Sequence, residues 1–247
     1  MKKVVALVTG GNRGIGASCV EEFAKSGVNV VINYCHHKEE AEQLAEHIRT
    51  TYQVEALVIK CDVSKEEEVE QMVNTTVDTF GGIDILVNNA GVSRDSLLLD
   101  KNEKEFKRVL DVNLLGTYLC AKYVGRVMLD QKKGKIINIS STNALDTFYP
   151  ESCDYDASKA GVISLTHNLA REFAPFISVN CVCPGWVKTA MNKDLSVEQV
   201  KEEKKKILLG RFADPEEIAK VVHFLSSNKA SYINDSIIRV DGGKYNG

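Results

Sequence analysis

The sequence lacks the features that mark several classes of protein. No apolar run approaches the roughly 20 residues that cross a bilayer, so we expect no membrane segment. The net charge is only −3, which gives no overall field for nucleic acid. The apolar start, Val4–Val8, meets a glycine-rich turn too early for the hydrophobic region of a signal peptide. A buried strand is the better interpretation of this start.

Cysteine is present, but without the pattern of a disulfide framework. The seven cysteines are an odd number, and no two have the C-x-x-C spacing. Scattered cysteines of this kind are typical of reduced thiols in a cytosol, so we predict a cytoplasmic protein. Cys35 with His36 and His37 is the only local metal-like cluster, and no second cluster supplies further zinc ligands. We predict no metal site.

Short apolar runs alternate with longer amphipathic segments along the chain. The runs are often β-branched and lack clear period-two alternation, as in strands covered on both faces. They are Val4–Val8, Val28–Ile32, Ala56–Ile59, Ile83–Val87, Lys135–Ile139, Ser178–Val182 and Ile237–Val240. This alternation predicts a parallel sheet with right-handed crossovers. We predict one α/β domain of Rossmann type over residues 1–247, doubly wound, with about seven parallel strands between helices on both faces.

Local signals predict where helices begin and end. Ser64–Glu67 has the pattern of a capping box opening a helix that runs towards Phe80. Asp214–Glu217 combines an N-cap Asp with Pro at the first helical position. Gly27 and the pair Gly81-Gly82 predict helix ends.

The first predicted strand leads into a glycine-rich turn, Thr9-Gly10-Gly11-Asn12-Arg13-Gly14-Ile15-Gly16, and a helix pattern follows. Glycines let the backbone turn tightly and approach a pyrophosphate on the helix N-terminus. An ordinary strand–helix loop is the alternative, but the position at the head of the chain favours a dinucleotide site. Ala17 stands where a Walker A loop has Lys, which argues against a nucleoside-triphosphate loop.

The spacing of this turn, T-G-x-x-x-G-x-G, resembles that of the classical short-chain dehydrogenase/reductase family. Further family motifs follow later strands, namely Asp62-Val63, Asn88-Asn89-Ala90-Gly91 and Pro184-Gly185. The resemblance runs from Val4 to the closing Val240–Gly243. It implies a cofactor site formed by Gly10, Asn12, Arg13, Gly14, Ile15, Gly16, Tyr34, Asp62, Val63, Asn89, Ala90, Gly91, Tyr155, Lys159, Pro184, Gly185, Val187 and Thr189.

The family's Tyr-x-x-x-Lys signature occurs three times, as Tyr34/Lys38, Tyr118/Lys122 and Tyr155/Lys159. Only Tyr155 and Lys159 lie at the head of a predicted helix, four residues apart and therefore on one face, after a Ser that ends a strand. Tyr34 ends a strand, where it is structural or at the edge of the cofactor, and Tyr118 lies within a helix. The resemblance therefore implies a catalytic set of Asn113, Ser141, Tyr155 and Lys159.

These residues suit the reduction of a ketone. The ketone receives hydride from a nicotinamide and needs a proton on its oxygen. A free Tyr has a pKa of about 10, and we expect the Lys159 ammonium to lower the pKa of Tyr155. Lys159 can also bind the nicotinamide ribose, and the Ser141 hydroxyl can orient the carbonyl. By resemblance, Asn113 holds a water that links Lys159 to solvent.

Two other classes fit less well. A serine hydrolase would need a G-x-S-x-G elbow, which this sequence lacks. A nucleotide-sensing protein of the same fold would be expected to have lost Tyr155 or Lys159.

The segment before Tyr155 departs from the family pattern. The gap of 14 from Ser141 to Tyr155 is one residue longer than the commonest family spacing. We place the extra residue in Phe148–Ser152 and expect it to alter the wall of the substrate pocket more than the chemistry. Residues 189–210 lie where the family has a mobile substrate lid.

The region after the second predicted strand favours NADP(H). Enzymes of this architecture that use NAD place an acid about 20 residues past the glycines. Here Asn33–Lys38 contains no acid, and Glu39 is the first. Arg13 matches the basic residue of NADP-using members and is the expected main partner of the 2′-phosphate. His36–Lys38 adds positive charge nearby.

Two segments, Val92–Leu98 and Gly210–Ala219, resemble 3-oxoacyl-[acyl-carrier-protein] reductases of this family. The resemblance implies NADPH-dependent reduction of a 3-oxoacyl thioester in fatty acid synthesis, by a homotetramer. The alternative is an NADP-dependent dehydrogenase of a hydroxysteroid, sugar or other secondary alcohol.

An acyl carrier protein is acidic, so its reductase needs a basic patch at the mouth of the active site. Lys132 matches one of two basic residues that serve this role in the resembling reductases. The second is missing after Leu169–Glu172, unless Lys122 or Arg126 replaces it.

Overall fold

The computed structural model of the chain describes residues 3–192 and 195–244. Within these ranges, seven parallel strands form one sheet in the order β3-β2-β1-β4-β5-β6-β7. The strands are β1 (Val5–Val8), β2 (Asn29–Tyr34), β3 (Ala56–Lys60), β4 (Ile85–Asn88), β5 (Gly134–Ile139), β6 (Ile177–Pro184) and β7 (Ile237–Val240). Every predicted run forms a strand whose ends lie within two residues of those expected, which confirms the predicted fold class.

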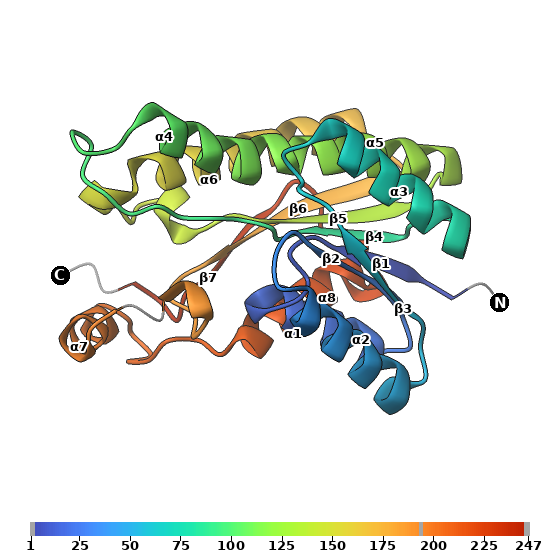
Figure 1. Cartoon of the computed structure of the whole chain (residues 1–247), viewed down its shortest axis with the longest axis horizontal. Helices are drawn as coiled ribbons and strands as arrows, with labels where there is room; N and C mark the ends of the chain where they lie inside the picture. The colour runs from blue at the N-terminus through green and yellow to red at the C-terminus, as the bar shows by residue number, and fades with distance from the viewer. Residues whose placement is uncertain (1–2, 193–194, 245–247) are drawn as a thin grey trace.

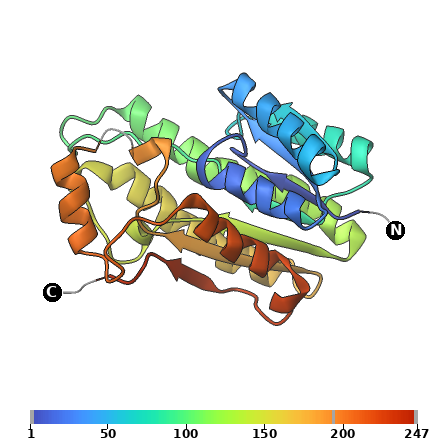
Figure 2. The ribbon, with the colours of Figure 1, turned by 90° about the horizontal axis from the view of Figure 1, so that it is seen from below.

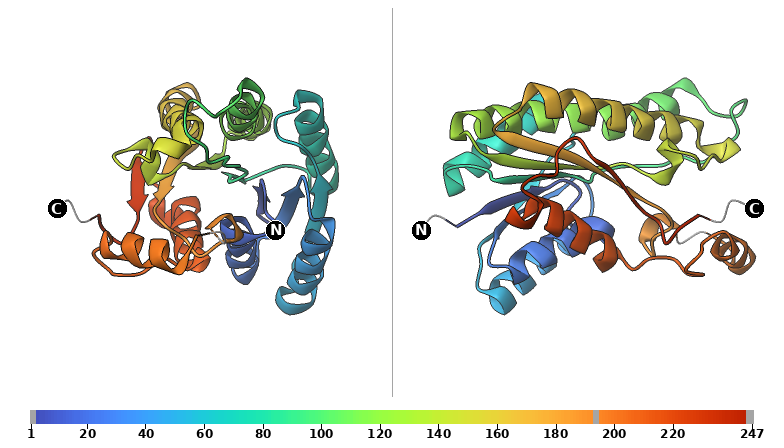
Figure 3. Two further views of the ribbon diagram at one scale, coloured as in Figure 1. Left: turned by 60° about the vertical axis from the view of Figure 1, so that its left-hand side comes forward. Right: turned by 180° about the vertical axis from the view of Figure 1, so that it is seen from behind.

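Helices cover both faces of the sheet, as a doubly wound fold requires (Figures 1 and 3). One face carries α1 (Gly14–Lys25), α2 (Lys38–Tyr52) and α8 (Pro215–Ser226), and α1 lies beside α8 (Figure 2). The other face carries α3 (Glu66–Phe80), α4 (Glu103–Leu110), α5 (Gly116–Gln131) and α6 (Cys153–Glu172). A further helix, α7 (Val197–Lys205), lies beyond the sheet, at the end of the molecule where the strands end.

The core has one layer on each side of the sheet. Neighbouring residues of β1 point to opposite faces, so that Ala6 and Val8 pack in the layer with α1 and α8. Val5 and Leu7 pack in the layer with α3, α5 and α6. Both layers are apolar, which explains why the strands show no period-two pattern. No helix in the described ranges is long and apolar enough to cross a membrane.

Three of the four predicted helix ends are confirmed. Asp214 and Glu217 form a capping box at α8, Gly81 ends α3 with φ +75°, and Gly27 follows α1 with φ +79°. The predicted Ser64 cap is wrong, because α3 begins at Glu66 after an uncapped Lys65. The Ser64 hydroxyl instead donates to the Asp62 carboxylate over 2.7 Å, because that charged acceptor lies only two residues away.

The topology places a crevice at the carboxyl ends of the strands. From β1 the chain continues to β2 on one side, whereas β4 lies on the other side of β1. The strand order therefore reverses between β1 and β4, and ligands of doubly wound sheets bind at such a point.

Candidate active site

A cleft of about 900 Å³ opens at this end of the sheet. Its walls come from the turn after β1, from the ends of β2, β4, β5 and β6, and from the head of α6. Most of the predicted site residues line it, namely Gly10, Asn12, Arg13, Gly14, Ile15, Asp62, Val63, Asn89, Ala90, Gly91, Ser141, Tyr155, Lys159, Pro184, Gly185, Val187 and Thr189. The exceptions are Gly16, Tyr34 and Asn113.

The glycine-rich turn forms a cradle for a phosphate group. Gly10 and Gly14 adopt positive φ angles of +58° and +55°. At Gly16 a Cβ atom would lie 2.2 Å from the Gly10 carbonyl oxygen, so this glycine lets α1 approach the turn and does not itself face the cleft. No side chain caps α1, and its first turn holds no acid. The N-terminus of α1 is therefore free to bind the pyrophosphate of a dinucleotide.

Thr9 and Asn89 tie the turn to the end of β4. The Asn89 Nδ2 group donates to the carbonyl oxygens of Thr9 and Gly10 over 2.9 and 3.0 Å. The Thr9 hydroxyl oxygen accepts from the backbone N–H groups of Asn89 and Ala90, each over 3.0 Å. These bonds fix both walls of the crevice at the point where the strand order reverses.

Tyr34 corrects one sequence prediction. It is the last residue of β2, and its ring is buried in the apolar layer with α1 and α2. Neighbouring strand residues point to opposite faces, so it is Asn33 that turns towards the crevice, where its Oδ1 accepts from the Gly10 N–H over 3.1 Å. Tyr34 therefore supports the fold and does not line the cofactor cleft.

The cleft wall after β2 contains no acid. Cys35, His36 and His37 line it, whereas Lys38 begins α2 outside it. The Asn12 Nδ2 group donates to the backbone carbonyls of His36 and His37, which fixes this loop against the glycine-rich turn. All seven cysteines are free thiols, and no group of three or more potential metal ligands occurs in the described ranges.

Asp62, the acid that follows β3 and also lines the cleft, is already engaged. Its Oδ2 lies 2.9 Å from Arg108 Nη2, and its Oδ1 accepts from Ser64. Burial acts to raise the pKa of Asp62, but the hydrogen bonds from Ser64 and Arg108 bring it below its ordinary value. Arg108 also lines the cleft and was not predicted, because nothing local in α4 distinguishes it from other exposed arginines.

The predicted catalytic pair, Tyr155 and Lys159, lies on one face of the first two turns of α6, the placement that the sequence predicted. Lys159 is buried, and its Nζ lies over the Tyr155 ring, 5.6 Å from the ring centroid. The same Nζ donates to the Ile139 carbonyl at the end of β5 over 2.8 Å. Ser141 follows β5 and faces Tyr155, with its hydroxyl oxygen accepting from the Asn143 N–H over 3.2 Å. Sequence reasoning missed Asn143.

The electrostatics of the pair differ from expectation. Burial raises the pKa of Tyr155 to about 12, and only the hydrogen bond with Ser141 opposes this. The expected lowering by Lys159 is wrong for this arrangement, because its ammonium is directed to the Ile139 carbonyl. Burial lowers the pKa of Lys159 itself to about 8. At neutral pH Tyr155 keeps its proton, which is the form that a proton donor to a ketone requires.

Asn113 lies behind the cleft wall. It is fully buried in a π-helical turn, Asp111–Leu115, that joins α4 to α5. Its Oδ1 accepts from the Val92 N–H over 2.8 Å, and its Nδ2 donates to the Val92 carbonyl and to the Ser158 hydroxyl, each over 3.0 Å. A Cβ atom on Gly91 would lie 3.4 Å from both Asn113 Oδ1 and Lys159 Nζ, so the two side chains are neighbours. The water-holding role of Asn113 stays a prediction.

One part of the cleft is lined by three side chains that we call the Glu203 cluster: Tyr149, Trp186 and Glu203. Glu203 Oε2 accepts from the Tyr149 hydroxyl over 2.8 Å and from Trp186 Nε1 over 3.0 Å. Burial acts to raise the pKa of Glu203, but hydrogen bonds from Lys206, Tyr149 and Trp186 lower it below its ordinary value. The segment expected to hold the extra residue thus supplies a wall residue, Tyr149.

The segment predicted as a lid contributes α7 and part of this wall. Asn192, Leu195, Gln199 and Glu203 line the cleft, while residues 193–194 of the predicted lid lie outside the described residues. Whether the segment moves stays a prediction.

The predicted basic docking patch is not at the mouth of this cleft. Lys132 precedes β5, whereas Ser141 follows β5, so the two lie at opposite edges of the sheet. Lys122 is paired with Glu66 over 2.6 Å, and Arg126 lies over the Tyr123 ring. The helix–strand turn before β5 points away from the carboxyl ends of the strands, so Lys132 does not reach the mouth of this chain's own cleft, and its role in docking stays a prediction.

Comparison with known proteins fits this geometry. Residues 10–245 match the sequence profile of a family described as Enoyl-(Acyl carrier protein) reductase. A mutant of the Serratia marcescens short-chain dehydrogenase/reductase superposes with a TM-score of 0.92 at 36% identity, covering 97% of both chains. The chain belongs to the short-chain dehydrogenase/reductase family. It is therefore an oxidoreductase that uses a nicotinamide cofactor.

Two curated relatives carry the same name. The 3-oxoacyl-[acyl-carrier-protein] reductase FabG of Staphylococcus aureus is 43% identical over 242 residues, or 97% of both chains. The FabG protein of Aquifex aeolicus is 41% identical over 242 residues, 98% of this chain and 97% of that protein.

Proposed function

We propose that this protein uses NADPH to reduce the ketone of 3-oxoacyl thioesters carried on acyl carrier protein, as in fatty acid synthesis. The observation that carries the proposal is the placement of Ser141, Tyr155 and Lys159 in the cleft that also holds the phosphate cradle. The activity for which the FabG relatives are named supports the choice of substrate.

The side chains have complementary roles in this reaction. When bound, the nicotinamide supplies a hydride to the carbonyl carbon. Tyr155 donates its phenolic proton to the carbonyl oxygen, so that the ketone becomes an alcohol. The Ser141 hydroxyl donates a hydrogen bond to the same oxygen and orients it. Lys159 binds the nicotinamide ribose through its ammonium, which the Ile139 carbonyl holds beside Tyr155.

The proposed preference for NADP(H) rests on the charges at the end of the cleft where the adenine ribose would bind. Arg13 is exposed and has no ion-pair partner among the described residues. No acid lies on the wall after β2, and Asp62 is already paired with Arg108. A 2′-phosphate therefore meets a free guanidinium, whereas ribose hydroxyls find no carboxylate to accept their hydrogen bonds.

The cofactor proposal is tested by comparing kcat/KM for NADPH and NADH. Arg13→Ala should lower the preference for NADPH by about 10- to 100-fold, the worth of one charge-assisted hydrogen bond. Lys38→Ala is the matched control, because Lys38 follows the wall residue His37 but does not itself line the cleft. Equal use of the two cofactors by the wild type, or an unchanged preference in Arg13→Ala, would refute the proposal.

The carrier proposal now rests on Arg94 instead of Lys132. Arg94 is exposed on the cleft rim, and its guanidinium has no ion-pair partner in the described part of the chain. Arg94→Glu should raise KM for a carrier-bound substrate, with a salt-dependent effect, and leave a small free ketone unaffected. Lys229→Glu is the charge-matched control away from the cleft. Equal effects of the two variants would contradict docking at this rim.

The substrate class is decided by cofactor turnover with a panel of compounds. We expect NADPH oxidation with acetoacetyl thioesters and none with crotonyl thioesters, which would report enoyl reduction. We also expect no oxidation of steroid or sugar alcohols with NADP. A wild type that reduces no 3-oxoacyl thioester but oxidises a steroid or sugar alcohol would instead establish the alternative, an NADP-dependent dehydrogenase of a secondary alcohol. A cytoplasmic homotetramer is part of the proposal, and light scattering of the purified protein tests the assembly.

A further inference from the structure

A buried ion pair lies directly beside the catalytic tyrosine. Lys101 Nζ is 2.8 Å from Asp154 Oδ2, and the two side chains are only 2% and 0% exposed. Lys101 lies in the loop before α4, and Asp154 is the second residue of α6, immediately before Tyr155. No other ion pair in the described ranges has both side chains so completely buried.

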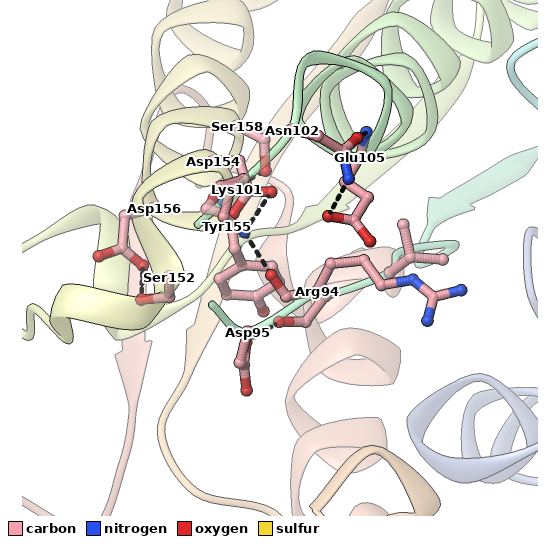
Figure 4. Close-up of polar contacts among 12 residues, drawn as sticks. Arg94, Asp95, Lys101, Asn102, Glu105, Ser152, Asp154, Tyr155, Asp156 and Ser158 are labelled. Carbon is pink, nitrogen blue, oxygen red and sulfur yellow. Dashed lines mark hydrogen bonds and ion pairs between the residues drawn. The ribbon is translucent and has the colours of Figure 1, made fainter. Parts of the chain in front are cut away.

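The remaining polar contacts of this pair go to the backbone of the active site (Figure 4). Asp154 Oδ1 accepts from the Tyr155 N–H over 2.9 Å, and Lys101 Nζ also donates to the Arg94 carbonyl. A continuous path of hydrogen bonds therefore joins Arg94, on the cleft rim, to Tyr155. Both carboxylate oxygens of Asp154 are used on this path.

Stability is a poor explanation for such a pair. Removing two charges from water costs about as much as their attraction returns, and apolar replacements are often neutral or stabilising. A role in fixing the register of two segments is the better-attested use of buried charges. Here the two segments are residues 92–101, which we call the cleft loop, and the first turn of α6.

The cleft loop has few other attachments. Asn113 holds its beginning at Val92, and the Ser96 N–H donates to the Glu151 carbonyl over 3.0 Å. Beyond Ser96, Leu97, Leu98 and Leu99 are 50%, 66% and 95% exposed, so packing contributes little. Arg94 lies between Val92 and Ser96, the two other points of attachment. The bond from Lys101 to the Arg94 carbonyl therefore holds this part of the loop and links it, through Asp154, to Tyr155.

We propose that Lys101 and Asp154 are positioning residues that hold Tyr155 in register with the cleft loop. The inference rests on the proposed function, because its meaning depends on Tyr155 as the proton donor to a ketone. A displacement of the phenol by even about 1 Å lowers the rate of such a transfer by up to about 100-fold.

The test uses the double variant Lys101→Met/Asp154→Asn in the full chain. The single variant Lys101→Met leaves a buried carboxylate without its partner and can fail to fold for that reason alone. The double variant removes both charges with side chains of similar size, and the amide oxygen that Asp154→Asn introduces can still accept from the Tyr155 N–H. It still loses the bond from residue 101 to the Arg94 carbonyl. Each protein is assayed with the best substrate of the wild type from the panel described above.

We expect the double variant to fold and to bind NADPH within about twofold of the wild type, with kcat lowered by about 10- to 100-fold. The solvent deuterium isotope effect on kcat should increase, because proton transfer from a displaced Tyr155 becomes slower. Lys107→Met is the matched control. It breaks an exposed pair with Glu103 on α4, where the side chains are 67% and 79% exposed, and should change none of these quantities.

Several results would overturn the proposal. A folded double variant with kcat within about twofold of the wild type and an unchanged isotope effect would leave the pair without a role in positioning. A parallel loss of NADPH affinity and kcat would indicate general distortion of the cleft, and failure to fold would indicate a structural role. A wild type that turns over only an alcohol outside the proposed class would refute the proposed substrate without affecting the comparison of the double variant with the wild type. Inactivity on the whole panel would refute both the proposed function and the positioning role.

Discussion

Gly16→Ala offers a sharp test of the phosphate cradle, because one methyl group meets two fixed atoms. The new Cβ would lie 2.2 Å from the Gly10 carbonyl oxygen and 2.6 Å from Asn89 Nδ2. Cβ atoms essentially never approach other atoms within 3.0 Å, so α1 or the turn must move by at least 0.8 Å, the difference between 3.0 and 2.2 Å. That movement also strains the bonds from Asn89 to Thr9 and Gly10.

The expected cost follows from these contacts. Overpacking costs about 1–3 kcal/mol, and each of the two weakened hydrogen bonds about 1 kcal/mol, giving roughly 3–5 kcal/mol in all. For a chain of this size each kcal/mol lowers Tm by about 2–4 °C, so Tm should fall by roughly 6–20 °C. NADPH affinity should fall at least about tenfold, because the N-terminus of α1 no longer meets the pyrophosphate. Thermal unfolding and a fluorescence titration with NADPH measure the two effects.

Gly27→Ala is the control at the other end of the same helix. Gly27 has φ +79°, and a Cβ there would meet no atom within 4 Å. Alanine at this position costs only the strain of a left-handed backbone, about 1 kcal/mol, and should leave NADPH affinity unchanged. A Gly16→Ala variant with the NADPH affinity and Tm of the wild type would refute our account of the cradle.

Two further predictions concern the catalytic pair. Tyr155→Phe should lower kcat by about 10²–10⁴-fold, the usual worth of a general acid, with little change in NADPH affinity, while Tyr118→Phe on α5 should leave kcat unchanged. The reverse result would mean that the catalytic pair has been assigned wrongly. Burial lowers the pKa of Lys159 from 10.5 to about 8, so its ammonium loses its proton as the pH rises through that value. NADPH affinity should therefore fall above pH 8 in the wild type and be independent of pH in Lys159→Met, and a flat wild-type profile would contradict this role.

Much of the fold was predictable because its determinants are local. Each strand is a short β-branched run, and each βα unit repeats the same alternation, so β1 to β7 follow from windows of a few residues. The phosphate cradle is equally local, since it needs only glycines at fixed spacing after a strand. The ends of helices were predicted less reliably. Ser64 has the correct residue type for a cap but lies beside Asp62, which competes for its hydroxyl.

The parts of the site that escaped prediction depend on pairs far apart in the chain. Glu203 meets Tyr149 across 54 positions, and Lys101 meets Asp154 across 53. Each member is an ordinary charged or aromatic residue in its own segment, and only the packing of α7 or α6 against distant loops gives it a partner. The raised pKa of Tyr155 was not predicted for the same reason. It is set by burial at the cleft wall and by the direction of the Lys159 ammonium.

The Glu203 cluster has an optical consequence. Trp186 is the single tryptophan of the chain, and its indole is stacked on Phe212, with centroids 5.4 Å apart and planes inclined by 13°. Its Nε1 bond to Glu203 joins it to α7, which contributes Gln199 and Glu203 to the lining of the cleft. All tryptophan emission from this protein therefore originates at one wall of the active site. Without any added label, its wavelength and intensity report whether α7 is in contact with that wall.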